Sequence, residues 1–312
     1  MAPASAPELL ALVLDARLCL QCGTPPGPRA AGGEGGAGAA APPGHGAKAP
    51  AEAAPGAFFQ RLWDALLVLC RAHGLLGADQ QVALFAAHSR RAALLVGGMC
   101  DAVDWEAARR AMATFALEPD GLPGTPQLAA ALSRALCYVN RAKRSQSGLC
   151  ARVLVLDSSP SEAEHCRQSP ALLGCAFAAQ AAGVPLDCLS LGREASVLLR
   201  QAASLAGGKH VALAPSGREQ RPEDVLVPVL LFHFLPGVAV RKGMNVTADV
   251  QNHAAVCACH GERKELAHVC SCCLAVYCSD AAAVCPACGT RFRHDRCADR
   301  RLLDLGPEGL CA

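Results

Sequence analysis

Two Cys-x-x-Cys pairs have the residue types and spacing that point most clearly to chemistry. Cys270 and Cys273 form the first pair, and Cys285 and Cys288 form the second, 11 residues further along the chain. A Cys-x-x-Cys turn presents two thiolates to one metal ion, and two such turns complete a tetrahedral zinc site. Such a site is structural, because protein ligands fill all four positions. We therefore predict one structural Zn²⁺ at Cys270, Cys273, Cys285 and Cys288. Cys272 could replace Cys273, but its spacing fits less well.

A second zinc site at Cys257, Cys259 and Cys278, with His260, is not expected. Cys257-x-Cys259 is tighter than a zinc knuckle, and Cys278 lacks a second cysteine two or three residues further on. Two complete sites would interleave as in a RING cross-brace. The sequence instead favours a single four-cysteine zinc finger at 253–292, RING-like but degenerate.

Oxygen ligands for a different metal occur at residues 152–161, which read RVLVLDSSPS. Asp157, Ser159 and Ser161 match an Asp-x-Ser-x-Ser pattern at the end of a buried strand, and hard cations such as Mg²⁺ prefer oxygen ligands of this kind. The alternative is a turn with polar caps.

The elements that must position these residues alternate between strands and helices. This alternation predicts an α/β fold with an open, mostly parallel sheet and helices on both faces. A hairpin at 81–96 adds an antiparallel edge. Strands are expected at 8–14, 81–87, 92–96, 152–157, 185–190 and 209–213, and helices at 58–73, 104–116, 125–143, 168–182, 194–206 and 222–235.

The chain is expected to contain two folded units. The α/β domain spans 1–240, and within it residues 23–57 are almost entirely Gly, Ala and Pro, which predicts a disordered insertion. The zinc finger at 253–292 follows, and then a tail at 293–312.

Composition excludes several classes of function. The net charge of +2 gives no strong field for nucleic acid or a membrane surface, and no apolar run is long enough to span a bilayer. The start of the chain favours a first strand over a signal peptide. Most of the cysteines outside the finger are scattered, which is typical of a reducing compartment.

No residues suggest catalysis. The sequence shows no nucleophile–base pair, and Gly207-Gly208 is not followed by the Lys-Ser/Thr pair of a phosphate-binding loop, so we expect a helix C-cap there. His73, His88 and His165 have no partner at ligand spacing, and we expect them at the surface or at helix ends. The protein is therefore not expected to be an enzyme.

Five stretches of the chain together match a known family. They are LLALVLDA at 9–16, AFAAQAAGVPLDCLSLG at 176–192, LRQAASLAGGKHVAL at 199–213, LLFHFLP at 230–236 and HAAVCACH…VCSCCLAVYC…VCPAC at 253–288. In these stretches the chain resembles the family of 34-kDa core subunits of general transcription factor IIH (TFIIH). The resemblance covers most of 8–292 and excludes the insertion and the tail. It implies a von Willebrand A-like domain followed by a four-cysteine zinc finger.

The resemblance also changes the interpretation of Asp157. In a von Willebrand A domain the Asp-x-Ser-x-Ser motif ends the first strand, and a loop Thr and an Asp after the fourth strand complete the metal site. Here the first strand ends in Asp15-Ala-Arg17-Leu-Cys19, which lacks both serines and places the cation of Arg17 where the ion would lie. The resemblance thus implies that Asp15, Thr125 and Asp157 are remnants of a lost site. We prefer the turn for Ser159.

The resemblance implies a nuclear, non-catalytic structural subunit of the TFIIH core complex. It would act in RNA polymerase II transcription initiation and nucleotide excision repair. Its partners would be the other core subunits, chiefly the larger subunit that also carries a von Willebrand A domain and a RING. No small-molecule substrate or membrane is implied.

Two alternatives remain open. A RING-type ubiquitin ligase would need two complete zinc sites. A zinc-ribbon nucleic-acid-binding protein would contact phosphates through a basic tail, and whether DNA is touched directly is left open. The arginines of that tail are Arg291, Arg293, Arg296, Arg300 and Arg301.

Overall fold

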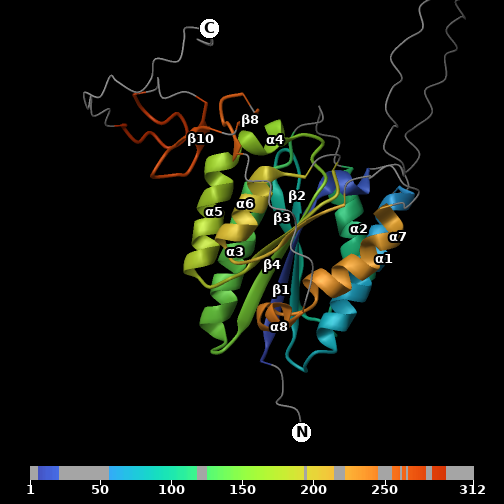
Figure 1. The fold of residues 1–312 in the computed structure, drawn as a ribbon. Coiled ribbons are helices and arrows are strands. Elements are labelled where there is room, and N and C mark those ends of the chain that lie inside the picture. Colours follow the sequence, from blue (N-terminus) through green and yellow to red (C-terminus); the bar gives the residue numbers. More distant parts are fainter. Residues whose placement is uncertain are drawn as a thin grey trace, which may run out of the picture.

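The computed structural model describes an α/β domain and a small cysteine-rich module (Figure 1). The residues described are 6–20, 56–117, 125–192, 195–213, 222–244, 255–260, 262–264, 266–278 and 283–292. Nearly all of the predicted insertion at 23–57 and all of the predicted tail at 293–312 lie outside them. Of the arginines named above for a basic tail, the described residues include Arg291. The disorder of the insertion and the domain bounds stay predictions.

A six-stranded sheet forms the centre of the α/β domain, with strand order β3-β2-β1-β4-β5-β6. The strands β1, β2, β4, β5 and β6 are parallel, and β3 pairs antiparallel with β2 at one edge. This is the open, mostly parallel sheet expected for a von Willebrand A-like fold, including its antiparallel hairpin. The strands are β1 (Glu8–Asp15), β2 (Gln81–Ala87), β3 (Ala92–Met99), β4 (Cys150–Asp157), β5 (Leu186–Ser190) and β6 (His210–Ala212).

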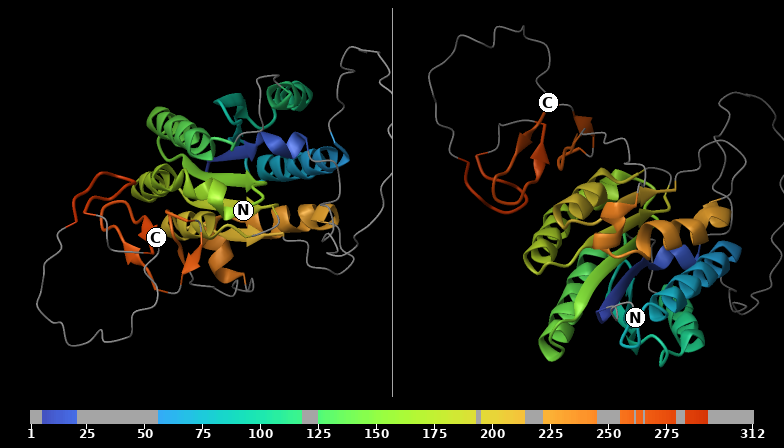
Figure 2. Two further views of the ribbon diagram at one scale, coloured as in Figure 1. Left: turned by 90° about the horizontal axis from the view of Figure 1, so that it is seen from above. Right: turned by 60° about the horizontal axis from the view of Figure 1, so that its bottom comes forward.

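Helices cover both faces of the sheet (Figures 1 and 2). Strand β1 shows why, because its alternate side chains enter different cores: Leu9 and Val13 pack on one face, and Leu10 and Leu14 on the other. A strand buried on both faces reads as a continuous apolar run. The first face is covered by α3 (Leu128–Ser145), α5 (Ser169–Ala181) and α6 (Val197–Leu205), and the second by α1 (Ala57–Gly74), α2 (Trp105–Ala116) and α7 (Pro222–Val229).

The last helices differ from the single helix expected at 222–235. Helix α7 ends at Val229 and continues as the π-helix η2 (Leu230–Phe234), in which Leu235 N donates to Leu230 O at 2.9 Å. Pro228 lies inside α7 and lacks an N–H, which removes one hydrogen bond of the regular ladder just before the π-turn. A further helix, α8 (Val238–Gly243), follows. In the described part of the chain no helix has the length and apolar character needed to cross a membrane.

The buried side chain of Arg152 ties the end of η2 to the sheet. From β4 its guanidinium donates to the carbonyl oxygens of Phe234, of Leu235 at 2.8 Å and of Pro236 at 3.2 Å. An ion pair with Glu8 at 3.0 Å compensates the buried charge. The Phe-Leu-Pro stretch that carries part of the family resemblance is thus the one whose carbonyls this arginine binds.

The cysteine-rich module consists of two short antiparallel pairs. Strand β7 (Ala255–Val256) pairs with β8 (Arg263–Lys264), and β9 (His268–Val269) pairs with β10 (Val276–Tyr277). Its few buried side chains make a core too small to hold a fold without help. Metal binding can supply that stability.

Candidate metal centres

The four cysteines predicted to bind zinc lie together. The Sγ atoms of Cys270 and Cys288 are 3.7 Å apart, and those of Cys273 and Cys285 are also 3.7 Å apart. All four Sγ atoms lie within 4.8 Å of one another. A tetrahedral Zn²⁺ with Zn–S bonds of about 2.3 Å separates its sulfur ligands by about 3.8 Å, so the cluster fits this ion.

Both knuckles of this cluster have the same backbone geometry. The residue after the second cysteine is left-handed in each, with φ of +74° at Gly289 and +57° at Leu274. Each donates its N–H to the carbonyl of the first cysteine, Cys285 or Cys270, at 2.8 Å. Glycine is the expected residue for such a turn. Leucine is not, but the side chain of Leu274 packs against the core of the α/β domain, which explains its presence.

Nearby donors favour the thiolate form of two ligands. Hydrogen bonds from Thr290 lower the pKa of Cys288 to about 6. Burial opposes ionisation of Cys285, but the hydroxyl of Tyr277, 3.2 Å from its Sγ, lowers the pKa overall. Burial raises the pKa of Cys273 to about 12, and the neighbouring thiols add to the rise. Thiols this close cannot all ionise without a cation between them, so the donor set suits a bound metal.

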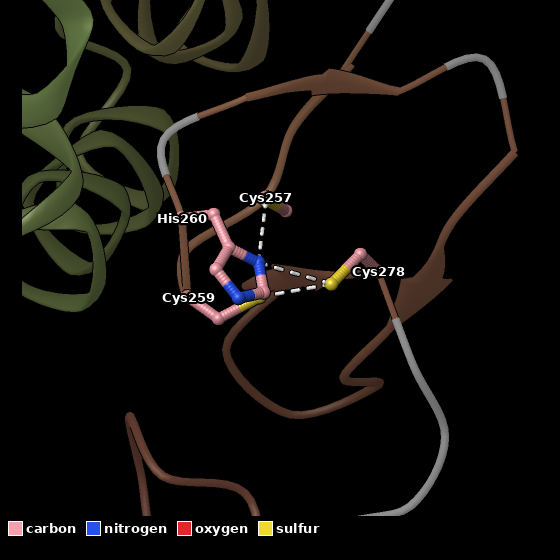
Figure 3. Close-up of side chains that lie close together, drawn as sticks. All are labelled: Cys257, Cys259, His260 and Cys278. Carbon is pink, nitrogen blue, oxygen red and sulfur yellow. Dashed lines mark hydrogen bonds between the residues drawn. The ribbon is translucent and has the colours of Figure 1, made fainter. Parts of the chain in front are cut away.

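A second cluster joins Cys257, Cys259, His260 and Cys278, as Figure 3 shows. The Sγ atom of Cys278 is 3.3 Å from that of Cys259 and 3.3 Å from Nδ1 of His260. Nδ1 of His260 is also 3.8 Å from Sγ of Cys257. This differs from the sequence analysis, which expected no such site because Cys278 has no cysteine neighbour at knuckle spacing.

The partner strand explains the difference. Ala258 N donates to Val276 O at 2.7 Å, which holds the Cys257–His260 turn against the end of β10. Cys278 follows β10 directly and therefore reaches the turn from across the module. Spacing rules compare neighbours in sequence, so they miss a ligand that arrives alone from another strand.

The positions that resemble remnants of a von Willebrand A metal site lie in the α/β domain. Asp15 ends β1 and Asp157 ends β4, and these two strands are adjacent and parallel. The strand order of the sheet reverses between them, and ligands of α/β folds commonly bind at such a reversal point. The guanidinium of Arg17 contacts Oδ2 of Asp15 at 2.9 and 3.1 Å, Oε2 of Glu164 at 2.8 Å and Oγ of Ser159 at 2.9 Å. Arg17 thus lies as the sequence analysis expected, with its cation on the carboxylate.

The second carboxylate also has a cationic partner within the chain. Nε2 of His165 lies 3.2 Å from Oδ2 of Asp157, and Ser159 Oγ donates to Oδ1 at 2.7 Å. Burial opposes ionisation of Asp157, but His165 and Ser159 lower its pKa overall. Burial likewise disfavours the imidazolium of His165, but Asp157, with Glu162 and Glu164, raises its pKa overall.

His165 was expected at the surface or at a helix end. It lies in the last turn of a helix, but it is buried rather than exposed. It lies with Glu164 on α4 (Glu162–Cys166), a helix that was not predicted. The signal was present, since Ser161-x-x-Glu164 has the pattern of a capping box at a helix start. His73 is buried too, with Nε2 3.3 Å from Glu8 O, and burial lowers its pKa to about 4.

Thr125 lies elsewhere. It lines a groove between α3 and α5 together with Gln127 and Gln168. Among the described contacts it makes none to Asp15 or Asp157. Burial raises the pKa of Asp15, and Arg17 opposes that rise. Because Arg17 contacts Asp15 and His165 contacts Asp157, both carboxylates already have a basic partner within this chain. The donor set does not fit a Mg²⁺ ion.

Comparison with known proteins gives one consistent result. The model of the family "Transcription factor Tfb4" matches residues 99–289, more than half of the chain. General transcription factor IIH subunit 3 of Dictyostelium discoideum is 33% identical over 164 residues, covering 52% of this chain and 41% of that protein. The general transcription and DNA repair factor IIH subunit TFB4 of Arabidopsis thaliana is 29% identical over 174 residues, covering 55% and 54%. The chain thus spans about half the length of the curated relatives it matches.

Among solved structures, the TFIIH p34 N-terminal domain is similar, with a TM-score of 0.49 and 22% identity over 73% of this chain and 98% of that one. The family model includes both cysteine pairs and the strands β4, β5 and β6 of the sheet. The chain belongs to the Tfb4 family of transcription factors.

Proposed function

We propose that this chain is a non-catalytic structural subunit of the TFIIH core complex, acting in the nucleus in RNA polymerase II transcription initiation and nucleotide excision repair. Membership of the Tfb4 family, whose curated relatives are named as TFIIH subunits, supports the complex. The observation that best supports a non-catalytic role is the pairing of Asp15 and Asp157 with basic side chains, at the ends of β1 and β4 where the strand order reverses.

At that point an active von Willebrand A domain would present free carboxylates to a metal and its ligand. Here Arg17 engages Asp15 and His165 engages Asp157, at 2.9 and 3.2 Å. Such a buried network favours a fixed scaffold over exchange of a ligand. Gly207 and Gly208 are explained by the fold. Gly207 has a left-handed backbone conformation just after α6, and a Cβ on Gly208 would lie 2.1 Å from the carbonyl oxygen of Leu186. They therefore suggest no phosphate site.

We further propose that Cys270, Cys273, Cys285 and Cys288 bind one structural Zn²⁺. Four sulfur ligands leave no open position for a substrate or an activated water. The ion would hold the two knuckles together, and with them Leu274 against the α/β domain. The zinc finger would then present a fixed surface to a neighbouring subunit.

The chief partner in this proposal is the larger TFIIH subunit that also carries a von Willebrand A domain and a RING. The test is to tag the full chain at its own expression level and isolate it from nuclear extract. Quantitative mass spectrometry should find the TFIIH core subunits in equal molar amounts, with the larger subunit retained at the highest salt. Recovery of the chain without TFIIH subunits would overturn the proposal.

One observation favours a second candidate, a RING-type ubiquitin ligase. Along the chain the ligands of the two clusters alternate: Cys257, Cys259 and His260 precede Cys270 and Cys273, and Cys278 precedes the pair at 285 and 288. This is the interleaved order of a cross-brace. The assay is discharge of ubiquitin from a panel of charged conjugating enzymes by the full chain. Discharge no faster than the enzymes alone is expected; acceleration that the Cys285→Ser, Cys288→Ser variant lacks would favour the ligase.

A further inference from the structure

We propose that Cys257, Cys259, His260 and Cys278 bind a second Zn²⁺, and that this ion fixes the start of the cysteine-rich module against the α/β domain. The ligands would be three thiolates and Nδ1 of the imidazole. All four ligand atoms lie within 4.8 Å of one another, as in the four-cysteine cluster.

The distances between these atoms are those of a tetrahedron around one ion. The contacts of 3.3, 3.3 and 3.8 Å are close to the separations of about 3.4–3.8 Å that Zn–S bonds of about 2.3 Å and a Zn–N bond of about 2.0 Å produce. In Figure 3 the imidazole of His260 lies between the sulfur atoms of Cys257 and Cys278, with Cys259 beside it. Three sulfur ligands with one nitrogen suit zinc rather than Mg²⁺ or Ca²⁺, which take oxygen ligands.

A disulfide explains the cluster less well. Sγ of Cys259 and Sγ of Cys278 are 3.3 Å apart, whereas a disulfide bond is about 2.05 Å long. A disulfide between these two would also give no role to His260, whose Nδ1 faces both Cys257 and Cys278. A metal uses all four groups.

The position of the cluster indicates what the second ion would stabilise, namely the junction between the α/β domain and the cysteine-rich module. Cys257 is buried and directly follows β7, and its carbonyl is 4.0 Å from Sγ of Cys166 on α4. Residues of β7 also contact α6 and β10. Figure 1 shows the module beside the end of the α/β domain that carries α4. The four-cysteine site lies further along the module, so the second ion would join the strand that leaves the α/β domain to the rest of the finger.

The test is the zinc content of the purified full chain, by inductively coupled plasma mass spectrometry against amino-acid analysis. We expect two zinc ions per chain for the wild type and one for Cys278→Ser. The control is Cys272→Ser, which removes an exposed cysteine that belongs to neither cluster and should therefore retain two ions. One ion in the wild type and still one in Cys278→Ser would overturn the proposal. So would a Cys259–Cys278 disulfide in protein purified with zinc.

A second measurement keeps the proposal testable if Cys278→Ser fails to fold. The full chain is reconstituted with Co²⁺, whose visible bands report the ligand set. His260→Cys should retain two cobalt ions and shift part of the band intensity to longer wavelength, because thiolate is a weaker-field ligand than imidazole. An unchanged spectrum, or binding of one cobalt by both proteins, would contradict the role of His260. Either failure leaves the proposed TFIIH role intact, because that role is tested by co-purification.

Discussion

The guanidinium of Arg17 lies directly on the carboxylate of Asp15, with Nη2 2.9 Å and Nε 3.1 Å from Oδ2. Asp15 is fully buried, whereas Arg17 is partly exposed. A cation of the chain thus takes the place that a bound ion would need, at the carboxyl ends of the paired strands β1 and β4, where the strand order of the sheet reverses.

Replacing Arg17 by Met should destabilise the protein by about 3 kcal/mol, because it leaves a buried carboxylate without its counter-charge. Urea unfolding followed by circular dichroism gives the free energy. The double variant Arg17→Met, Asp15→Asn should recover much of the loss, since no buried charge then remains unpaired. A loss below 1 kcal/mol in the single variant would show that the pair contributes little.

His165→Gln should destabilise the protein in a pH-dependent manner. The pKa of His165 is raised above its ordinary 6.5, so the stabilisation from the protonated ring is fully present below about pH 6.5 and declines as pH rises through the raised value. The pKa of Asp157 is lowered below 3.8, so the contribution of its ionised carboxylate to stability is lost only in strong acid. The difference in unfolding free energy between wild type and variant should therefore be largest near pH 5–6. A difference that grows with pH up to 9 would contradict the assignment.

Arg241→Lys should weaken the attachment of α8. Nη1 and Nη2 of Arg241 each lie 2.7 Å from an oxygen of the buried carboxylate of Asp187, and Lys cannot reproduce this two-pronged contact. We expect a loss of about 2 kcal/mol in unfolding free energy. The control is Arg109→Ala, which removes an exposed pair with Glu106 and should cost less than about 1 kcal/mol. Equal losses of unfolding free energy in the two variants would contradict the prediction that the buried Arg241–Asp187 pair contributes more than an exposed one.

Cys285→Ser together with Cys288→Ser should release the ion of the four-cysteine site and unfold the module, while the α/β domain stays folded. Hydrogen exchange followed by mass spectrometry should show protection lost at 266–292 and kept at 81–99. The control is Cys272→Ser, which should keep both. Full retention of zinc by the double variant would contradict the ligand assignment.

Deleting 24–55 should leave the melting temperature almost unchanged. The composition predicts a segment that cannot pack, and closing a long loop costs little more than closing a short one. The flanking residues are already close, since Gly56 N donates to Cys19 O at 3.4 Å. Differential scanning calorimetry of the deletion, joined by a short Gly-Ser linker, makes the comparison. A drop of more than about 5 °C would show that the segment packs.

The sheet and the proximity of the four cysteines could be predicted because their signals are local. Strands such as β1 and β4 are apolar runs buried on both faces, and each Cys-x-x-Cys knuckle is complete within four residues. The second cluster could not, because Cys278 reaches His260 only through the pairing of the module's strands. The burial of His165 and its contact with Asp157 were not predicted, because α4 is five residues long, too short for a helical period to register. The role of Arg152 could not be predicted either, because it depends on the carbonyls of Phe234, Leu235 and Pro236, about 80 residues further along the chain.

The two edges of the sheet differ from the central strands in how readily a further strand could pair with them. On one side β6 has three residues, and so few backbone groups are left for another strand to pair with. On the other side the pairing of β3 with β2 shifts register between Leu84 and Phe85, and such an irregularity twists an edge away from flat pairing. Both edges therefore disfavour extension by a foreign strand. Short or irregular edges of this kind reduce the tendency of a sheet toward edge-to-edge aggregation.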